Sequence, residues 1–448
     1  MSAANEPIVA LATASGRSAI GIIRISGSDL NPLVAALLKN IPKPRNATLC
    51  SIEANGRLID QCLVLYFVAP RSYTGEDMLE IQTHGNPVLL DSLIQHTCSL
   101  GARMARPGEF TERAFLNGKM DLAQAEAVAD LIHAASEQAI RAAVRTLKGS
   151  FSQAITEIRN QLVLIRVQLE SHLDFPTEEL DQQHLPELHV ALSALAVQLK
   201  RMLTQGQQSL VLAEGAHLAL VGRPNTGKSS LFNALAGQDL AIVNEQAGTT
   251  RDIVQCRLLF NGVALELADT AGLNSHTQDG IELEGMQRGL ARAAEADILL
   301  WVADMEHPTF DDLPAVQQQE QSGTPVIRLV NKTDLADASW RPPEKAIAVS
   351  ALTGAGLHQV KEQILTCLGQ DPNQSESDTD FLARRRHIEH LRQAADAVDH
   401  ALVELKAASM ELAAEYLREA NHALGGIMGD MTSDELLGEI FSRFCIGK

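Results

Sequence analysis

The feature that most constrains this chain is residues 222–229, GRPNTGKS, which fit the phosphate-binding pattern G-x-x-x-x-G-K-[ST]. The apolar run before it, residues 217–221, predicts a buried strand, and residues 230–236 after it predict a helix. In such a strand–loop–helix unit the backbone N–H groups and the helix dipole converge on phosphate oxygens. An ordinary glycine-containing loop is the less favoured interpretation. We expect Lys228 to reach the β- and γ-phosphates and Ser229 to bind Mg²⁺.

Three later segments follow predicted strands in the same way. They are DTAG at 269–272, NKTD at 331–334 and SAL at 350–352. Asp269 suits an outer-sphere contact to Mg²⁺, and the Gly272 N–H suits the γ-phosphate. The Asp334 carboxylate can accept hydrogen bonds from guanine N1–H and N2–H₂, which adenine does not offer. Four such loops at the carboxyl ends of parallel strands indicate a guanine-nucleotide site.

The predicted GTP-binding residues lie in these four loops and in the loop before Arg251. They are Asn225, Thr226, Gly227, Lys228, Ser229, Ser230, Asn244, Glu245, Gln246, Ala247, Gly248, Thr249, Thr250, Asp269, Thr270, Ala271, Gly272, Asn331, Lys332, Asp334, Ser350, Ala351 and Leu352. Within this set, we expect a backbone N–H of residues 350–352 to meet guanine O6.

Composition limits the class of protein. A chain of 448 residues has room for roughly three ordinary domains. The formal net charge of −19 argues against an overall basic nucleic-acid platform. The six cysteines are scattered without a C-x-x-C pair, which is typical of reduced thiols. No apolar run reaches about 18 residues and no signal peptide is present, so we expect a cytoplasmic protein without membrane attachment.

The pattern along the chain predicts α+β and α/β domains together with a helical bundle. Residues 1–118 predict an α+β domain, with strands near 8–11, 21–25, 62–68 and 78–82 and helices near 29–39 and 87–100. Arg24 and Glu80 lie within apolar strands of this domain. Alternation alone favours solvent-facing positions for both side chains, and a small-molecule pocket is the alternative.

The rest of the chain predicts a helical domain interrupted by a GTPase domain. Residues 119–214 predict helices at about 121–147, 151–173 and 186–212. Residues 215–372 form the expected Ras-like P-loop GTPase domain, which ends near a polar linker at 370–380. Residues 373–448 predict helices at about 381–407 and 409–424 and a last helix opened by a capping box at 432–435. Apolar helix faces on both sides need partners, so we expect one helical domain with the GTPase domain inserted into it.

The hydrolytic machinery differs from that of Ras-type GTPases. The position after D-x-x-G holds Leu273, which has no group to orient a water molecule. Glu282 or Glu284 could act through a water, and the residues alone do not choose between them. No arginine finger is evident. Asn225 and the carbonyls of residues 244–250 could instead hold a monovalent cation, with Thr250 as the second hydroxyl on Mg²⁺.

At this point the sequence resembles one family nearly from end to end, the MnmE (TrmE) family of tRNA modification GTPases. The resemblance includes YTGED at 73–77, ARPGEFTERAFLN at 105–117, residues 119–131, DFP at 174–176, the nucleotide motifs, FLARRR at 381–386 and FCIGK at 444–448. It implies an N-terminal domain that dimerises and binds a 5-formyl-tetrahydrofolate, so that the chain is a homodimer. It also implies a flavoprotein partner, MnmG, and a tRNA substrate whose wobble uridine is modified at C5.

The resemblance also implies residue roles. Folate contacts fall on Arg24, Glu80, Lys119 and Lys448, which reverses the preference for solvent-facing Arg24 and Glu80. Glu282 is implied to position the hydrolytic water, and Cys445 to serve the modification. K⁺ contacts fall on Asn225, Asn244, Gln246 and Thr249, and Mg²⁺ contacts on Ser229 and Thr250. In the family, position 244 is often Thr, position 246 is often Ile or Leu, and position 86 is often Gly, where this chain has Asn86. Backbone carbonyls at 244 and 246 would serve K⁺ whatever the side chains.

The expected function is therefore GTP hydrolysis coupled to tRNA modification. Potassium-dependent dimerisation of the GTPase domains would drive it, and a (carboxymethyl)aminomethyl group would be added to the wobble uridine of certain tRNAs together with MnmG. One alternative is a regulatory or ribosome-assembly GTPase that acts by binding alone. The other is a folate-dependent one-carbon transferase with an ancillary GTPase. A folate pocket would argue against the first alternative, because a GTPase that acts by binding alone needs no such pocket.

Overall fold

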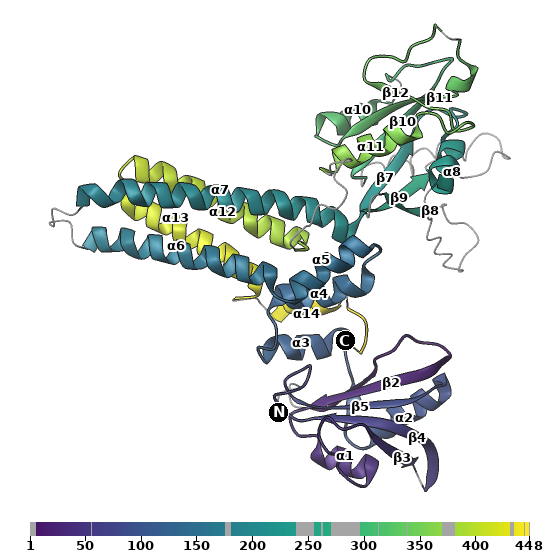
Figure 1. Cartoon of the computed structure of the whole chain (residues 1–448), viewed down its shortest axis with the longest axis vertical. Coiled ribbons are helices and arrows are strands. Elements are labelled where there is room, and N and C mark those ends of the chain that lie inside the picture. The colour runs from purple at the N-terminus through teal and green to yellow at the C-terminus, as the bar shows by residue number, and fades with distance from the viewer. Residues whose placement is uncertain are drawn as a thin grey trace. The chain divides into compact units, whose positions relative to one another are not determined.

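The computed structural model describes residues 6–54, 56–174, 181–238, 255–260, 263–269, 296–311, 313–337, 339–369, 381–430, 434–442 and 444–447. Its contacts divide the chain into two units (Figure 1). One unit contains residues 1–132, 146–168 and 414–448, and the other contains residues 133–145 and 169–413. Among the described residues, no helix is both long and apolar enough to cross a membrane.

A six-stranded sheet, sheet A, organises the N-terminal region in the order β3-β4-β5-β2-β1-β6. All neighbouring strands are antiparallel except β1 and β6. The four strands that the sequence predicts are present, whereas β3 was not predicted, because its outward residues include an exposed leucine, Leu49, that blurs the alternation. The strands are β1 (Ile8–Leu11), β2 (Ser18–Gly27), β3 (Thr48–Ala54), β4 (Arg57–Phe67), β5 (Asp77–Gly85) and β6 (Arg103–Met104).

Two helices supply the core of this sheet. Helix α1 (Asn31–Leu38) contributes Leu33, Val34, Leu37 and Leu38, and helix α2 (Pro87–Ser99) contributes Leu90, Leu93 and Ile94. They pack with inward residues of β1 to β5. At the start of α2, the Asn86 side chain accepts a hydrogen bond from the Val88 N–H at 3.0 Å. Asn86 therefore acts as an N-cap in front of the proline that begins the helix.

Helix α3 (Glu109–Leu116) is an element that the sequence did not predict. Its buried side includes two charged residues, Glu109 and Arg113, which reverses the usual amphipathic pattern. The Arg113 guanidinium donates to Glu109 Oε1 at 3.2 Å and to Glu76 Oε2 at 2.9 Å. Burial would raise the pKa of Glu109, but hydrogen bonds from Arg103 and the Arg106 N–H, with Arg113 nearby, lower it to about 2. The buried charges are thus paired, as burial requires.

The predicted long helix at 121–147 is wrong, because the structure has two helices there. They are α4 (Leu122–His133) and α5 (Glu137–Leu147). The Ser136 hydroxyl accepts a hydrogen bond from the Ala139 N–H at 3.1 Å. This contact is an N-cap, and it starts a second helix although the alanine-rich sequence would allow one continuous helix.

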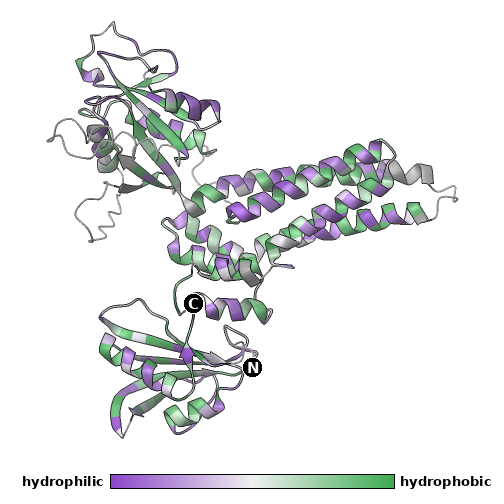
Figure 2. Ribbon diagram, turned by 180° about the vertical axis from the view of Figure 1, so that it is seen from behind, coloured by the Kyte–Doolittle hydropathy of each residue, from purple (hydrophilic) through white to green (hydrophobic). Residues whose placement is uncertain are grey.

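The helices that flank the GTPase domain in sequence pair with each other, as the predicted insertion requires. Lys200 of α7 forms an ion pair with Asp399 of α12, and Arg159 of α6 donates to the side chain of Asn421 of α13. These helices alternate hydrophobic and hydrophilic residues along their length (Figure 2). The capping box predicted at 432–435 includes residues outside the described set. The helices are α6 (Ser150–Asp174), α7 (Asp181–Glu214), α12 (Arg385–Lys406), α13 (Met410–Met428) and α14 (Asp434–Ser442).

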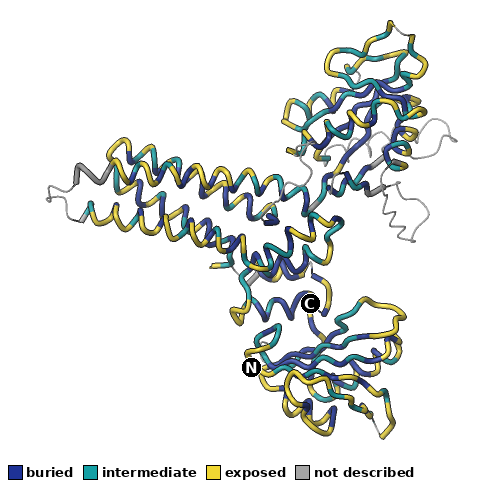
Figure 3. The backbone as a smooth tube through the Cα atoms, viewed as in Figure 1, coloured by how far each residue is buried: buried dark blue, intermediate teal, exposed yellow. Residues whose placement is uncertain are grey.

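The GTPase domain is built on a second six-stranded sheet, sheet B, in the order β12-β11-β10-β7-β9-β8. All neighbours are parallel except β8 and β9. Its central strands are deeply buried (Figure 3), and Trp301 of β10 is 1% exposed. The strands are β7 (Ala216–Val221), β8 (Gln255–Phe260), β9 (Val263–Asp269), β10 (Ile298–Asp304), β11 (Val326–Asn331) and β12 (Ala346–Ala348). The helices are α8 (Lys228–Gln238), α10 (Pro314–Gln321), the short 3₁₀ turn η2 (Thr333–Leu335) and α11 (Leu357–Cys367).

Candidate functional site

The phosphate-binding loop lies between β7 and α8, as the sequence predicts. Two of its positions accept only glycine. A Cβ atom at Gly222 would lie 2.1 Å from the Val302 carbonyl oxygen, and one at Gly227 would lie 2.3 Å from Asn331 Nδ2. Both glycines have positive φ, and so does Asn225 at 64°. Left-handed backbone of this kind turns successive N–H groups into a concave nest for anions.

The Lys228 ammonium is held inside this loop. It donates to the Gly222 carbonyl oxygen at 2.9 Å and to the Arg223 carbonyl oxygen at 2.7 Å. Lys228 is only 7% exposed, and it is the first residue of α8. Ser229 follows it and is exposed. Positive charge, helix N-terminus and backbone nest therefore coincide, which is the electrostatic arrangement that favours a polyphosphate.

Asn331 joins the phosphate-binding loop to the loop expected to contact guanine. Its Nδ2 group donates to the Thr226 carbonyl oxygen at 3.0 Å, and its Oδ1 accepts the Ala351 N–H at 3.0 Å. The residue is 2% exposed. Because both ends of one buried amide are satisfied by neighbouring loops, the relative position of these loops is fixed.

Asp334 lies beside the same junction. The Ser350 hydroxyl donates to Asp334 Oδ1 at 2.5 Å, and the Thr333 hydroxyl donates to the Val349 carbonyl oxygen at 2.8 Å. The Ser350 N–H donates to the Ala355 carbonyl oxygen, and Leu352 is 84% exposed. Because the Ser350 and Ala351 N–H groups have protein acceptors in this structure, recognition of guanine O6 by residues 350–352 stays a prediction.

Asp269, another predicted residue, lies at the same edge of sheet B. The backbone of Asp269 pairs with Leu220 at the end of β9, next to the phosphate-binding loop. Several predicted residues lie outside the described residues: Asn244, Glu245, Gln246, Ala247, Gly248, Thr249, Thr250, Thr270, Ala271, Gly272, Glu282 and Lys448. Their assigned roles stay predictions.

A second site surrounds Arg24 and Glu80 on sheet A. The two residues face each other on β2 and β5, and the Arg24 Nη2 and Nε groups donate to Glu80 Oε1 at 2.8 and 3.0 Å. Their side chains are 18% and 16% exposed. The solvent-facing interpretation, which alternation alone favoured, is therefore wrong for both. Paired in this way, the two side chains present donors and acceptors at one place.

Aromatic rings and the C-terminal segment complete this second site. The Arg24 guanidinium lies 5.4 Å from the ring centre of Tyr73 and 5.9 Å from that of Phe110. Its Nη1 group donates to the Gly447 carbonyl oxygen at 3.4 Å. Burial raises the pKa of Tyr73, whose hydroxyl bonds to the Thr111 hydroxyl at 2.8 Å. A guanidinium and two aromatic rings gathered at one place are suited to contact a flat heterocycle.

Lys119 and Cys445, the remaining predicted residues, lie around the same region. The Lys119 ammonium donates to the Pro70 carbonyl oxygen at 2.9 Å, and its stem passes the loop that holds Tyr73, at Gly75. The Cys445 carbonyl oxygen accepts the Gly108 N–H at 3.4 Å, while the residue itself is exposed. The five cysteines whose side chains the structure describes are free.

Sequence reasoning missed Tyr73, Phe110 and Asp304. Asp304 ends the buried strand β10 with a polar residue, which is the same pattern that identified Asp269 and Asn331. That signal was available in the sequence. Tyr73 and Phe110 offered no comparable signal, because nothing in their neighbourhood distinguishes a ring on a ligand site from a ring in a core.

Comparison with known proteins bears on the whole chain. The family described as the GTP-binding protein TrmE N-terminus matches residues 7–119, and the MnmE helical domain family matches residues 122–445. Proteins named tRNA modification GTPase MnmE from Pseudomonas syringae pv. tomato and Pseudomonas aeruginosa are 44% and 45% identical, over 100% of both chains in each case. The protein of that name from Bordetella parapertussis is 45% identical over 99% of both chains. The solved G domain of the T. maritima FeoB iron transporter matches 34% of this chain and 98% of its own at 27% identity, with a TM-score of 0.26. On the full-length relatives and the two family matches, the chain belongs to the MnmE family of tRNA modification GTPases.

Proposed function

We propose that this chain hydrolyses GTP and uses the cycle to modify tRNA. With the flavoprotein MnmG, it would add a (carboxymethyl)aminomethyl group to C5 of the wobble uridine of certain tRNAs in the cytoplasm. The observation that best supports GTP binding is the Asn331 side chain, whose hydrogen bonds join the phosphate-binding loop to the loop expected to contact guanine at one edge of sheet B. The role in tRNA modification is supported by membership of the MnmE family.

The proposal is tested by nucleoside analysis of tRNA from cells that lack the protein. The modified wobble uridine should disappear, and the wild-type chain should restore it. The exposed Cys445 is proposed to serve the modification, so Cys445→Ser should fail to restore the nucleoside while still hydrolysing GTP. An unchanged nucleoside profile in the deletion strain would instead favour a regulatory GTPase that acts by binding.

The same proposal includes K⁺-dependent pairing of two GTPase domains in a homodimer. Asn225, with the left-handed backbone of the phosphate-binding loop, is one proposed K⁺ contact. The exposed apolar residues Leu49, Leu58 and Leu63 on β3 and β4 support contact between N-terminal regions of two copies.

We expect GTP turnover per molecule to rise with protein concentration in K⁺, and to be roughly tenfold lower at every concentration in Na⁺ because the smaller ion fits carbonyl ligands poorly. Equal rates in the two salts would remove the cation from the mechanism.

Glu282→Ala should bind GTP as the wild type does and hydrolyse it about 100-fold more slowly, as expected when the group that activates water is removed. Normal turnover of the variant would move the water-positioning role to another residue, such as Glu284.

The Arg24 site is proposed to bind a 5-formyl-tetrahydrofolate, with Arg24, Glu80, Lys119 and Lys448 as contacts. The paired Arg24 and Glu80 and the Tyr73 and Phe110 rings support a flat, polar heterocycle there. Folate binding at this site would favour the modification enzyme over a GTPase that acts by binding alone, because the latter needs no such site.

Arg24→Gln should weaken binding of 5-formyl-tetrahydrofolate by roughly 100-fold, because a charge-assisted contact is lost and Glu80 is left unpaired. GTP turnover should stay unchanged. Isothermal titration checks the binding, with Arg17→Gln, an exposed arginine just before β2, as the matched control. Equal folate affinity in wild type and Arg24→Gln would exclude the surroundings of Arg24 as the folate site.

A further inference from the structure

Four basic side chains gather around the loop that follows β4, and we call them the basic cluster: Lys43, Arg45, Arg71 and Lys119. They come from three separate stretches of the chain, and all four residues are exposed. Two contacts bring these stretches together. The Arg45 Nη2 group donates to the Arg71 carbonyl oxygen at 2.7 Å, and the Lys119 ammonium donates to the Pro70 carbonyl oxygen at 2.9 Å.

Arg45 is held in place at both its backbone and its side chain. Its backbone N–H donates to the Tyr66 carbonyl oxygen at 2.7 Å, and its φ of 58° is left-handed. Its guanidinium carbon lies 5.8 Å from the ring centre of Phe67, within the range of a cation–π contact. Lys43 begins the same turn, where its carbonyl oxygen accepts the Asn46 N–H at 3.2 Å. A planar guanidinium that is already positioned loses less conformational freedom when it binds a phosphate.

No described carboxylate neutralises the basic cluster. Among the residues that the structure describes, none of its four side chains takes part in an ion pair. The acidic residues of the following turn are bonded elsewhere. Glu76 Oε2 accepts from Arg113 at 2.9 Å, and the Asp77 carboxylate accepts the Tyr66 hydroxyl and the Ala69 N–H, both at 2.9 Å. The cluster is therefore a local positive patch in a chain whose formal net charge is −19.

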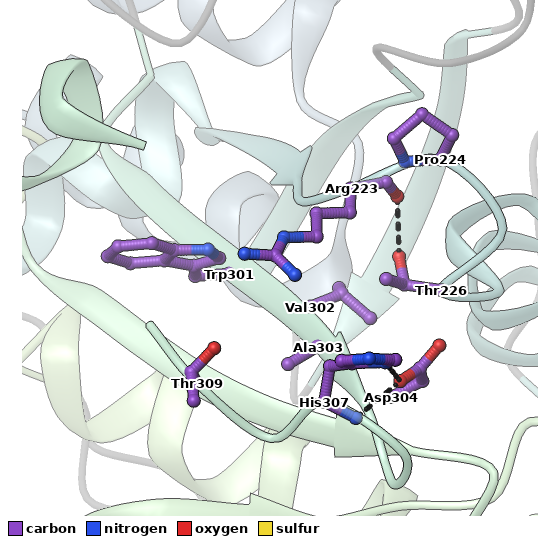
Figure 4. Close-up of a pocket in the computed structure, with 9 residues that line it drawn as sticks. All are labelled: Arg223, Pro224, Thr226, Trp301, Val302, Ala303, Asp304, His307 and Thr309. Carbon is purple, nitrogen blue, oxygen red and sulfur yellow. Dashed lines mark hydrogen bonds and ion pairs between the residues drawn. The ribbon is translucent and has the colours of Figure 1, made fainter. Parts of the chain in front are cut away.

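The basic residues beside the nucleotide site are arranged differently. Arg223 and His307 line a hollow of about 220 Å³ next to the phosphate-binding loop, and Asp304 lines the same hollow (Figure 4). Asp304 Oδ1 lies 3.8 Å from His307 Nδ1, and its Oδ2 lies 3.6 Å from the Lys332 ammonium. A long polyanion that approached these cations would also meet the Asp304 carboxylate. The basic cluster is therefore the better surface for a phosphate backbone.

The basic cluster borders the Arg24 site. Arg71 lies two positions before Tyr73, whose ring centre is 5.4 Å from the Arg24 guanidinium. A Cβ atom at Gly75, in the same turn, would lie 3.2 Å from Cγ of Lys119. A nucleic acid held by the cluster would thus lie next to the aromatic rings and the paired charges of that site.

From this geometry we propose that the basic cluster binds the phosphate backbone of the substrate tRNA and holds the RNA beside the Arg24 site. The inference rests on the tRNA function proposed above and adds the surface on which the RNA docks. Phosphate contacts of this kind position an RNA without reading its sequence. RNA is favoured over an anionic membrane because the chain belongs to a family of tRNA modification GTPases and because the cluster borders the proposed folate site.

The test combines Arg45→Gln with Arg71→Gln in the full-length chain, because neither residue is a proposed folate contact. The probe is a fluorescently labelled, unmodified tRNA transcript with uridine at the wobble position, and its anisotropy is measured at several KCl concentrations. The affinity should fall roughly tenfold at about 0.1 M salt, because two phosphate contacts are lost. The slope of log affinity against log salt should decrease in magnitude by about 1.5 for the same reason. GTP turnover and folate affinity should equal those of the wild type.

Two further double variants serve as controls. Arg17→Gln with Arg57→Gln removes the same number of charges from exposed positions of the same region, and Arg57 begins β4 at the end away from Phe67. Its tRNA affinity should stay within about twofold of the wild-type value, because charges distant from the RNA contribute little at this ionic strength. Arg45→Lys with Arg71→Lys keeps both charges and should retain most of the affinity and the salt slope.

Several results would overturn the inference. They are a wild-type affinity and salt slope for the Arg45 and Arg71 glutamine variant, equal losses in the two glutamine variants, or a lysine variant that binds as weakly as the glutamine variant. Unchanged tRNA binding with lost binding to vesicles of an anionic lipid would assign the cluster to a membrane surface instead. A wild-type chain that binds no tRNA at low salt would also refute it. The proposed function fails separately, if the nucleoside profile of the deletion strain is unchanged.

Discussion

Replacing Asp334 with asparagine is expected to transfer the purine preference of this chain from guanine to xanthine. We propose that the Asp334 carboxylate accepts hydrogen bonds from guanine N1–H and N2–H₂. Asparagine keeps one acceptor for N1–H and offers an N–H donor to the C2 carbonyl oxygen of xanthine. The Ser350 hydroxyl, 2.5 Å from Asp334 Oδ1, can hold either side chain in place. GDP affinity should fall on the order of a thousandfold, because edge recognition by buried hydrogen bonds is steep.

Competition of GDP and XDP against a labelled nucleotide measures this change. Asp337→Asn is the matched control, because Asp337 is exposed on the segment that follows the same loop and should not change either affinity. XDP should displace the label from Asp334→Asn at concentrations where GDP does not. If the variant binds GDP as tightly as the wild type, the base is recognised elsewhere.

Lys228→Ala is expected to slow GTP hydrolysis by roughly 100- to 1,000-fold. The ammonium is buried in the phosphate-binding loop and held by the carbonyl oxygens of Gly222 and Arg223. We propose that this positive charge stabilises the negative charge that develops on the transferred phosphoryl group. Removing one such preorganised group costs roughly 100- to 1,000-fold in rate. The two loop carbonyls also lose their donor, so GTP affinity should fall as well.

Turnover at saturating GTP, with affinity measured separately, separates the two losses. Lys345→Ala removes an exposed lysine from a turn of the same domain and should leave both quantities unchanged. If the turnover of Lys228→Ala stays within about twofold of the wild-type value, the role assigned to Lys228 is wrong. The removal of a catalytic hydrogen-bond donor reduces the rate by far more than twofold.

The elements that sequence reasoning predicted correctly share one property, which is that their patterns are local. The strand, loop and helix around Lys228 follow from an apolar run, a glycine motif and a helical sequence that are adjacent in the chain. Two predictions failed for different reasons. Helix α3 buries Arg113 because Glu76, 37 residues away in the sequence, pairs with it. The single helix expected at 121–147 fails for a local reason, because Ser136 forms an N-cap that starts α5.

The sequence by itself predicted a guanine-nucleotide site at loops following parallel strands, because each loop has its characteristic residues within a few positions of its own strand. Only the tertiary structure decided which side chains meet. Arg24 and Glu80 are 56 residues apart, and Thr226 and Asn331 are 105 apart, yet each pair shares a hydrogen bond. The partner of Lys332 is likewise chosen by the register of β10 against β11. Such pairings depend on strand order, register and burial, which arise only when the whole chain packs.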